Sequence, residues 1–342
     1  MSYVALPDEC FWQRCLSAPD FRLADLYRPS VLIGPDDAVA TAGSCFAQKI
    51  GRELRRSNAR FLDLEPVPHG MTEATAARLG FGLFSARYGN IYSTAQMLQL
   101  AEDALCDGLR EEAFWEKGGR WVDGLRPRLE PGGFASMEMA GVARLVHLAQ
   151  VRRLFSEARV FIFTLGLTER WEDGRTGTVY PLCPAAVDPD FGHPSHRFHN
   201  ARVGEVVAEL TALVLLLRGV NPALRFVFTV SPVPLMATAT GGHVLGATAR
   251  SKAVLRAAVD EVLATLPGCD YFPSYEIATQ NPLLRDAFGP DQREVREEVV
   301  ERIMQVFFAG QSGILREGQG AALQGDKGIE VCDEVLLDAA RG

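Results

Sequence analysis

The sequence has no long apolar run. No window reaches roughly 18 consecutive apolar residues, and the longest stretch, LTALVLLLRGV, is interrupted by Arg218, so we expect no membrane span. It also has no excess of basic residues, because 35 Lys and Arg stand against 43 Asp and Glu, giving a net charge of -8. That balance argues against nucleic acid or an anionic membrane surface as the main partner.

Paired cysteines are also missing. The seven cysteines are odd in number, are scattered along the chain and form no CxxC pair, which argues against a disulfide framework or a zinc site. The opening stretch, MSYVALPDECFWQRCLSAPDF, has early acids and no continuous apolar segment, so we expect no secretory signal. These absences together predict a protein of the reducing cytoplasm.

What the chain does have is enough apolar sequence for a large core. It has 342 residues, of which 47% are hydrophobic. In its second half, apolar strands (RVFIFTLGLTE, LRFVFTVSPVP, CDYFPSYEI) alternate with helical patterns, which is typical of a mostly parallel sheet covered by helices on both faces. We predict one α/β domain over residues 1–310, an inserted region at about 60–155, and a weakly ordered tail at 311–342.

One stretch, TAGSCFAQKIGREL, places two candidate nucleophiles between a strand and a helix. The apolar strand ends at Gly43, and Ser44 and Cys45 follow it directly. Glycine permits a turn that a side chain would block, and the free N–H groups of a helix start can stabilise an oxyanion or a thiolate. The alternative is structural, with Ser44 as a helix cap and Cys45 as a small buried residue.

Several longer motifs carry a resemblance to a known family. VATAGSCFAQKI, RYGNIYSTAQMLQL, VFIFTLGLTERW, FTVSPVPLMAT, SKAVLRAA and YFPSYEI occur in this order, and the chain resembles the GSCFA-domain family over about residues 5–310. That family is considered related to the SGNH/GDSL hydrolases and is similar to capsular polysaccharide acetyltransferases. The resemblance implies an SGNH-like three-layer α/β/α fold. It also implies acyl-ester chemistry on a saccharide or related small molecule, by an esterase or an O-acyltransferase.

The resemblance assigns roles to residues at the strand ends. SGNH enzymes carry their nucleophile at the third position of a Gly-Asp-Ser block, which corresponds here to Gly43-Ser44-Cys45. By that register the nucleophile is Cys45, and Ser44 is the alternative. A thiol needs less help from a base than a hydroxyl, because part of it is already ionised near neutral pH.

The oxyanion donors of SGNH enzymes come from two further blocks. Gly89 and Asn90 are candidates for one block, although Gly-Asn is also common in plain turns. Gly166 and Thr168 stand at the other, and Thr168 replaces an Asn, so it can donate one hydrogen bond instead of two. Glu169 is expected to orient the base or to bind a sugar hydroxyl, unless it is a helix N-terminal acid.

The general base is harder to place. The Asp-x-x-His that ends SGNH enzymes corresponds to the residues DQRE here, which begin at Asp291 and include no His. We expect His243, in the loop after the SPVP strand, to be the base, with Glu169 or Asp291 orienting it. His199 and Asn200 are the alternative, as a base or as substrate contacts.

The remaining candidates concern ligands. Ser251 and Lys252 are expected to open a helix, where they would suit an anion, unless Lys252 is simply solvated. The segment HPSHRFHN places three His in one short loop, without a carboxylate or Cys to complete a set, so we predict no metal. No cofactor is required by this interpretation, and acetyl-CoA is one candidate acyl donor. The sequence leaves the substrate, the choice between hydrolysis and transfer, and the oligomeric state open.

A second class of function also stays open at this point. Because the Asp-x-x-His is missing, the chain could be a non-catalytic carbohydrate-binding or scaffold domain derived from a hydrolase.

Overall fold

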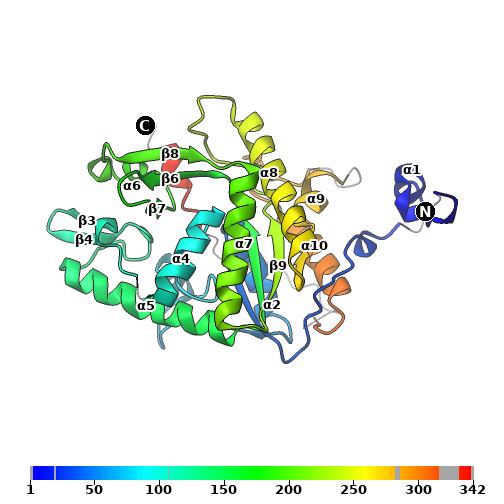
Figure 1. Ribbon diagram of the computed structural model, residues 1–342, viewed down its shortest axis with the longest axis horizontal. Helices are drawn as coiled ribbons and strands as arrows, with labels where there is room; N and C mark the ends of the chain where they lie inside the picture. The colour runs from blue at the N-terminus through cyan, green and yellow to red at the C-terminus, as the bar shows by residue number, and fades with distance from the viewer. Residues whose placement is uncertain (1–2, 19–20, 107, 282–285, 316–330, 340–342) are drawn as a thin grey trace.

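The centre of the molecule is a five-stranded parallel sheet, seen in Figure 1. The computed structural model describes residues 3–18, 21–106, 108–281, 286–315 and 331–339. The sheet consists of β1 (Ala38–Gly43), β2 (Arg60–Phe61), β5 (Val160–Leu165), β9 (Arg225–Val230) and β10 (Cys269–Tyr271), in the order β10-β9-β5-β1-β2. All of its strand pairs are parallel. The predicted α/β fold with a mostly parallel sheet is therefore confirmed.

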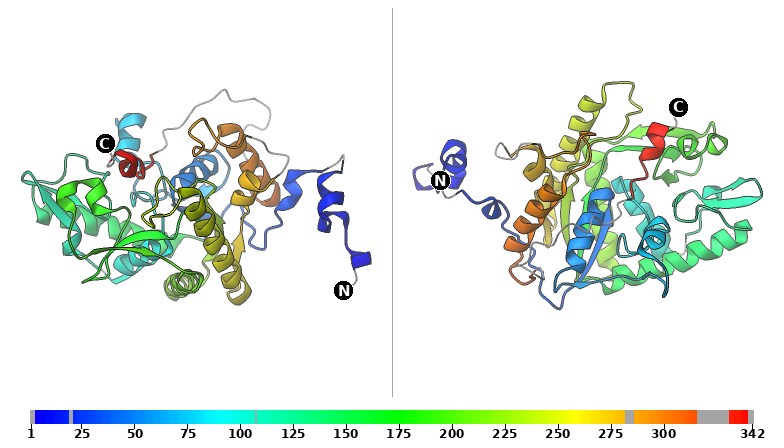
Figure 2. Two further views of the ribbon diagram at one scale, coloured as in Figure 1. Left: turned by 90° about the horizontal axis from the view of Figure 1, so that it is seen from above. Right: turned by 180° about the vertical axis from the view of Figure 1, so that it is seen from behind.

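Helices cover both faces of the sheet, so the domain has three layers (Figures 1 and 2). One face packs against α4 (Thr94–Cys106), α5 (Met137–Glu157), α7 (Val203–Val220) and α8 (Val244–Thr265). The other packs against α2 (Cys45–Arg55), α9 (Ser274–Thr279) and α10 (Glu297–Gly310). Successive side chains of a strand point to opposite faces, which is why Phe161 and Phe163 join the first layer and Ile162 joins the second.

Smaller elements surround this core. A hairpin is formed by β3 (Phe114–Lys117) and β4 (Arg120–Asp123), and a three-stranded sheet by β7 (Val179–Tyr180), β6 (Glu169–Asp173) and β8 (His196–Asn200). The short helices are α1 (Trp12–Leu16), α3 (Glu73–Arg78), α6 (Pro184–Val187) and α11 (Val335–Ala339). In the described part of the chain, none of the helices combines the length and apolarity needed to cross a bilayer.

Three local predictions are wrong. CDYFPSYEI is a strand only up to Tyr271, because Ser274 then begins α9 and its hydroxyl donates to the Val230 carbonyl at 3.0 Å. The second half of HPSHRFHN is a strand, because His196–Asn200 pairs with β6. The helix expected to open at Ser251 begins earlier, at Val244, because the His243 side chain already accepts from the Leu245 N–H.

The tail expected to be weakly ordered lies partly outside the described residues, at 316–330 and 340–342. Ile314 is buried in the layer of α10. Residues 331–334 lie against the loop that contains Asn90, since two side chains of the body bond the Val331 backbone. The limits of the single domain and of its inserted region stay predictions.

The strand order defines where a ligand site belongs. The chain passes from β1 outward to β2 and then returns to the other side of β1 as β5, so the order reverses between β1 and β5. In open α/β sheets the crevice outside the carboxyl ends of the strands, at such a reversal, is where ligands bind. Here those ends are followed by Gly43-Ser44-Cys45 and by Gly166-Leu167-Thr168.

A test of this geometry is Gly43→Ala. Gly43 has φ of 143°, and a Cβ there would lie 2.3 Å from the Thr164 carbonyl oxygen. We expect the free energy of unfolding to fall by about 3 kcal/mol or more, because both strain and a backbone clash arise. Gly177→Ala is the matched control: φ is also positive, at 76°, but nothing lies within 4 Å, so about 1 kcal/mol is expected. Urea unfolding measures both, and equal losses would contradict the clash.

Candidate active site

Cys45 lies at the centre of the candidate site. It is the first residue of α2, directly after the end of β1, and only 2% of it is exposed. Its thiol is hydrogen-bonded to that of Cys332, from the C-terminal segment. Because the first N–H groups of a helix have no partner within the helix, this position favours negative charge on a sulfur or on a bound oxygen.

Ser44 occupies the helix-cap position without acting as a side-chain cap. Its hydroxyl is buried, and the described residues give it no hydrogen-bond partner. The Ser44 Cβ lies 3.2 Å from where a Cβ on Gly166 would be, so this side chain lies against the backbone that follows β5. A buried hydroxyl without a partner is rare and marks this turn as unusual.

Lys252 is a buried cation of the site. It lies in the middle of α8 with 1% of it exposed, and its Nζ donates to the Gly166 carbonyl at 2.6 Å. Burial lowers its pKa to about 8, against the opposing charges of Glu334 and Cys45. A lysine with such a pKa can act as a general base near neutral pH.

The C-terminal segment Val331–Glu334 brings further charges to the same place. The Nη1 of Arg293 donates to the Cys332 Sγ at 3.3 Å, and the same guanidinium forms an ion pair with Glu334. The hydrogen bond from Cys45, together with the charge of Arg293, lowers the pKa of Cys332 to about 5. Burial raises the pKa of Glu334 to about 7 and that of Asp333 to about 6.

Asn90 binds this segment from the other side. Its Nδ2 donates to the Val331 carbonyl at 2.9 Å and to the Asp333 carboxylate at 2.8 Å. Its Oδ1 accepts from the Gln48 side chain at 3.0 Å. Gly89, just before it, has a positive φ of 72°. Asn90 is therefore buried, and its side chain points at the space that residues 331–333 fill.

Three other predicted residues meet next to Lys252. The Thr168 N–H donates to the Ser251 hydroxyl at 2.9 Å, and the Thr168 hydroxyl donates to Asn200 at 2.7 Å. Arg250 donates to the Thr168 hydroxyl at 3.2 Å and to the Ala201 carbonyl at 3.1 Å. These bonds occupy the Thr168 hydroxyl, so it is a fixed part of the wall instead of an available oxyanion donor.

The expected base is placed elsewhere. His243 is the exposed N-cap of α8, nine residues before Lys252 and therefore about 13 Å from it along the helix. Glu169 accepts from the Thr238 hydroxyl at 2.6 Å and from the Ala239 N–H at 3.1 Å, so it holds the loop after β9. The structure thus does not bring His243 to the buried Cys45, nor Glu169 to His243.

Two further candidates have structural partners. Asp291 is exposed, and its carboxylate accepts from the backbone N–H groups of Arg293 and Glu294 at 3.1 and 3.0 Å. It therefore shapes the turn that presents Arg293. The Nε2 of His199, on strand β8, lies 2.8 Å from the Glu205 carboxylate.

Sequence reasoning missed the charged partners of Cys45. Lys252 was expected at a solvated or anion-binding helix start, but it continues the apolar spacing of Leu255, Val259 and Val262, all buried. That spacing is the signal that could have found it, because a lysine on the buried face of a helix requires a special reason. Arg293 and Cys332 have no such periodic signal.

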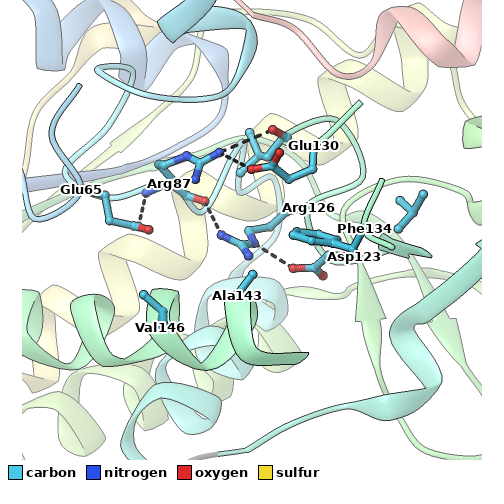
Figure 3. A pocket seen from close by; sticks show the side chains of 10 residues that line it. Glu65, Arg87, Asp123, Arg126, Glu130, Phe134, Ala143 and Val146 are labelled. Atoms are coloured by element: carbon cyan, nitrogen blue, oxygen red, sulfur yellow. Dashed lines mark hydrogen bonds and ion pairs between the residues drawn. The ribbon is translucent and has the colours of Figure 1, made fainter. Parts of the chain in front are cut away.

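A separate cavity of about 190 Å³ lies near the hairpin and α5. Figure 3 shows Arg126 within it, donating to the Asp123 carboxylate at 2.9 Å and to the Arg87 carbonyl at 3.1 Å. Arg87 in turn donates to Glu130 at 2.9 Å. These charges neutralise one another, which is typical of an internal network that holds the fold.

The buried charge of Lys252 predicts a pH-dependent stability. The pKa falls from its ordinary 10.5 to about 8, so between these pH values the unfolded chain binds more protons and the free energy of unfolding rises with pH. At pH 7 the buried ammonium costs about 3 kcal/mol. We expect Lys252→Met to unfold at higher urea than the wild type at pH 7, with the gain shrinking by pH 9.5.

The control for this prediction is Lys49→Met. Lys49 is equally buried, but its Nζ has an ion-pair partner, Glu297, at 2.9 Å. Removing it should lower stability, because Glu297 then keeps only Arg52 as an ion-pair partner and the Val295 carbonyl loses the Lys49 donor. A Lys252→Met protein that is destabilised like Lys49→Met would contradict an unfavourable buried charge.

Comparisons with known proteins identify a family. The comparison with curated proteins gives no significant match. Among solved structures, an acetyl esterase mutant with an acetate ion is similar at 11% identity and a TM-score of 0.33, covering 81% of this chain and 94% of that chain. At so low a score the likeness carries no argument about individual residues. The profile of the GSCFA family, however, matches residues 38–307. Because this match spans most of the chain, the protein belongs to the GSCFA family.

Proposed function

We propose that the protein catalyses acyl-ester chemistry with the Cys45 thiol as nucleophile and Lys252 as its base. The observation that carries this proposal is the position of Cys45 on the first turn of α2, in the same buried place as the lowered-pKa Lys252. A helix N-terminus and a neighbouring ammonium both favour a thiolate. Activated thiols with an adjacent base form covalent acyl intermediates.

The two chemical steps follow from these groups. With a pKa of about 8, about one tenth of Lys252 is neutral at pH 7 and can accept the Cys45 proton. The thiolate attacks the acyl carbon, and the leaving alcohol or thiol takes the proton back from Lys252. Water or a hydroxyl group of the acceptor then attacks the thioester, gives its proton to Lys252 and releases Cys45.

The oxyanion would be held by the N–H groups at the start of α2 and by Asn90. The Asn90 side chain already donates to a carbonyl oxygen, that of Val331, at 2.9 Å, which supports this role. Preorganised donors of this kind supply a large part of the acceleration in acyl transfer.

The charges around Cys45 support an anionic group on the substrate or the acyl donor. Arg293 holds the Glu334 carboxylate, and Arg128 lies 3.8 Å from that of Asp333. An acyl-CoA thioester and an acidic saccharide ester both carry such groups. Transfer to a saccharide hydroxyl and simple hydrolysis are the two forms of this proposal.

The test is intact-protein mass spectrometry after incubation with p-nitrophenyl acetate and, separately, with acetyl-CoA. We expect an acetyl adduct that is absent from Cys45→Ala and present in Ser44→Ala. Cys269→Ala, a buried thiol on β10, is the matched control and should keep it. Steady-state turnover should fall at least about a thousandfold in Cys45→Ala. The donor that works separates an acyltransferase from an esterase.

Residues 331–334 fill the site and could keep an acyl donor from reaching Cys45, so a variant that releases them is tested as well. Glu334→Gln weakens the ion pair with Arg293, and this variant is run beside the wild type. An adduct lost only in Ser44→Ala would move the nucleophile to Ser44. No adduct in either protein would overturn the enzyme proposal and favour a carbohydrate-binding or scaffold role.

The pH profile tests the base. Because Lys252 acts in its neutral form, kcat/KM should rise with pH and level off above about 8. Lys252→Met should lower kcat by about a hundredfold or more and remove this inflection. A profile that inflects near the ordinary pKa of a histidine, and is lost in His243→Gln, would instead favour His243.

A further inference from the structure

The C-terminal segment crosses the candidate site and is held there by specific bonds. Gln48 forms two bonds with the Val331 backbone, accepting from its N–H at 3.0 Å and donating to its carbonyl at 2.7 Å. The Asp333 N–H donates to the Tyr92 hydroxyl at 3.2 Å. Figures 1 and 2 show α11, which follows, in red beside α6 and the small sheet. The segment therefore has a defined place in the fold.

This placement puts two thiols together that lie near opposite ends of the sequence. Cys45 is fixed by the first turn of α2, while Cys332 lies on irregular chain between Val331 and Asp333. The two sulfurs are hydrogen-bonded to each other. A disulfide needs only a further approach of the sulfurs, which irregular chain allows more readily than a helix.

The surroundings also make one member of the pair reactive. Cys332 is half-buried, and Arg293 lies 3.3 Å from its sulfur. The hydrogen bond from Cys45 and this cation lower the pKa of Cys332, which favours its thiolate. Accessible thiolates with a neighbouring second thiol are the ones that form reversible disulfides.

We propose that Cys45 and Cys332 are a redox-active pair that a hydroperoxide converts into a disulfide, which locks the C-terminal segment in the site. The Cys332 thiolate attacks the peroxide O–O bond and becomes a sulfenic acid, while the alkoxide or hydroxide leaves and takes a proton. The Cys45 sulfur then attacks the Cys332 sulfur, and water leaves. Two thiols are oxidised by two electrons in total, and one peroxide is reduced.

The consequence for activity rests on the proposed function. If Cys45 is the nucleophile, the disulfide removes it and fixes residues 331–334 in the place of substrate, so oxidation switches the enzyme off until a dithiol reduces it. Formation of the disulfide itself does not depend on acyl chemistry and can be measured without it.

The experiment uses the full chain, reduced, desalted and treated at pH 7 with a small excess of hydrogen peroxide. Free thiols are then blocked with N-ethylmaleimide, and the protein is digested with trypsin without reduction. Measured before blocking, the intact mass should be lower by two hydrogens. The digest should contain a cross-link between peptide 23–49, which holds Cys45, and peptide 328–341, which holds Cys332. Dithiothreitol should reverse both.

Variants separate this pair from the other cysteines. Cys45→Ser and Cys332→Ser should each lose the cross-link, whereas Cys106→Ser, which removes an exposed thiol, should keep it. Arg293→Met should slow the oxidation of Cys332 measurably, because a smaller fraction of it is thiolate. The same treatment in urea should give little of this cross-link, since only the folded chain brings the two thiols together.

Several outcomes would overturn the inference. A folded wild-type protein that consumes peroxide without joining these two peptides would do so, as would equal cross-linking in urea or preferential pairing of Cys332 with another cysteine. An acetyl adduct on Cys45 without any cross-link would keep the proposed function and remove this inference. A cross-link without any acyl adduct would keep this inference and remove the proposed function.

Discussion

The close backbone contact between the ends of β1 and β5 is the constraint on which the site depends. Gly43 has no side chain because the Thr164 carbonyl takes that space. The Gly43 carbonyl also accepts from the Ile91 N–H at 2.9 Å. One residue therefore joins the start of α2, the end of β5 and the loop of Asn90. Cys45, Gly166 and Asn90 meet because these three backbones can approach one another this closely.

The charges at this edge partly offset one another's burial. Lys252 and Arg293 bring positive charge into a buried place, and Cys332 and Glu334 bring negative charge. A buried charge without a partner is strongly unfavourable, whereas a balanced group can be tolerated. The C-terminal segment is thus part of the electrostatic balance of the site in this conformation. Under the proposed function, a substrate that replaces the segment would need negative charge of its own.

The fold was largely predictable because it follows from local patterns. Apolar runs and helical spacing indicated β5, β9, α7 and α10 and, through the alternation of strands and helices, the parallel sheet. The predicted strand at YFPSYEI failed because a hydrogen bond from Ser274 to the neighbouring strand starts a helix there. Such a bond depends on tertiary contacts, which periodicity does not report.

The site was predictable only where it follows directly from strand ends. Cys45 and Thr168 follow β1 and β5, which end at one edge of the sheet, so their placement could be inferred, while their roles stay predictions. Asn90 follows no strand of this sheet and was proposed only from the resemblance. His243 was expected on a loop, but it caps α8, which begins earlier than its sequence pattern indicated. Cys332 could not be found, because nearly the whole chain separates it from Cys45 and no repeating pattern marks it.

The occupied site has a consequence for apparent affinity. A ligand that binds only where residues 331–334 now lie can bind only the fraction of molecules in which they have left. The measured dissociation constant is then the intrinsic one divided by that fraction. With about one molecule in a hundred open, binding would look about a hundredfold weaker than the intrinsic affinity of the site. Weak binding by the full chain would therefore reflect how few molecules have an open site as well as how well the ligand fits the site.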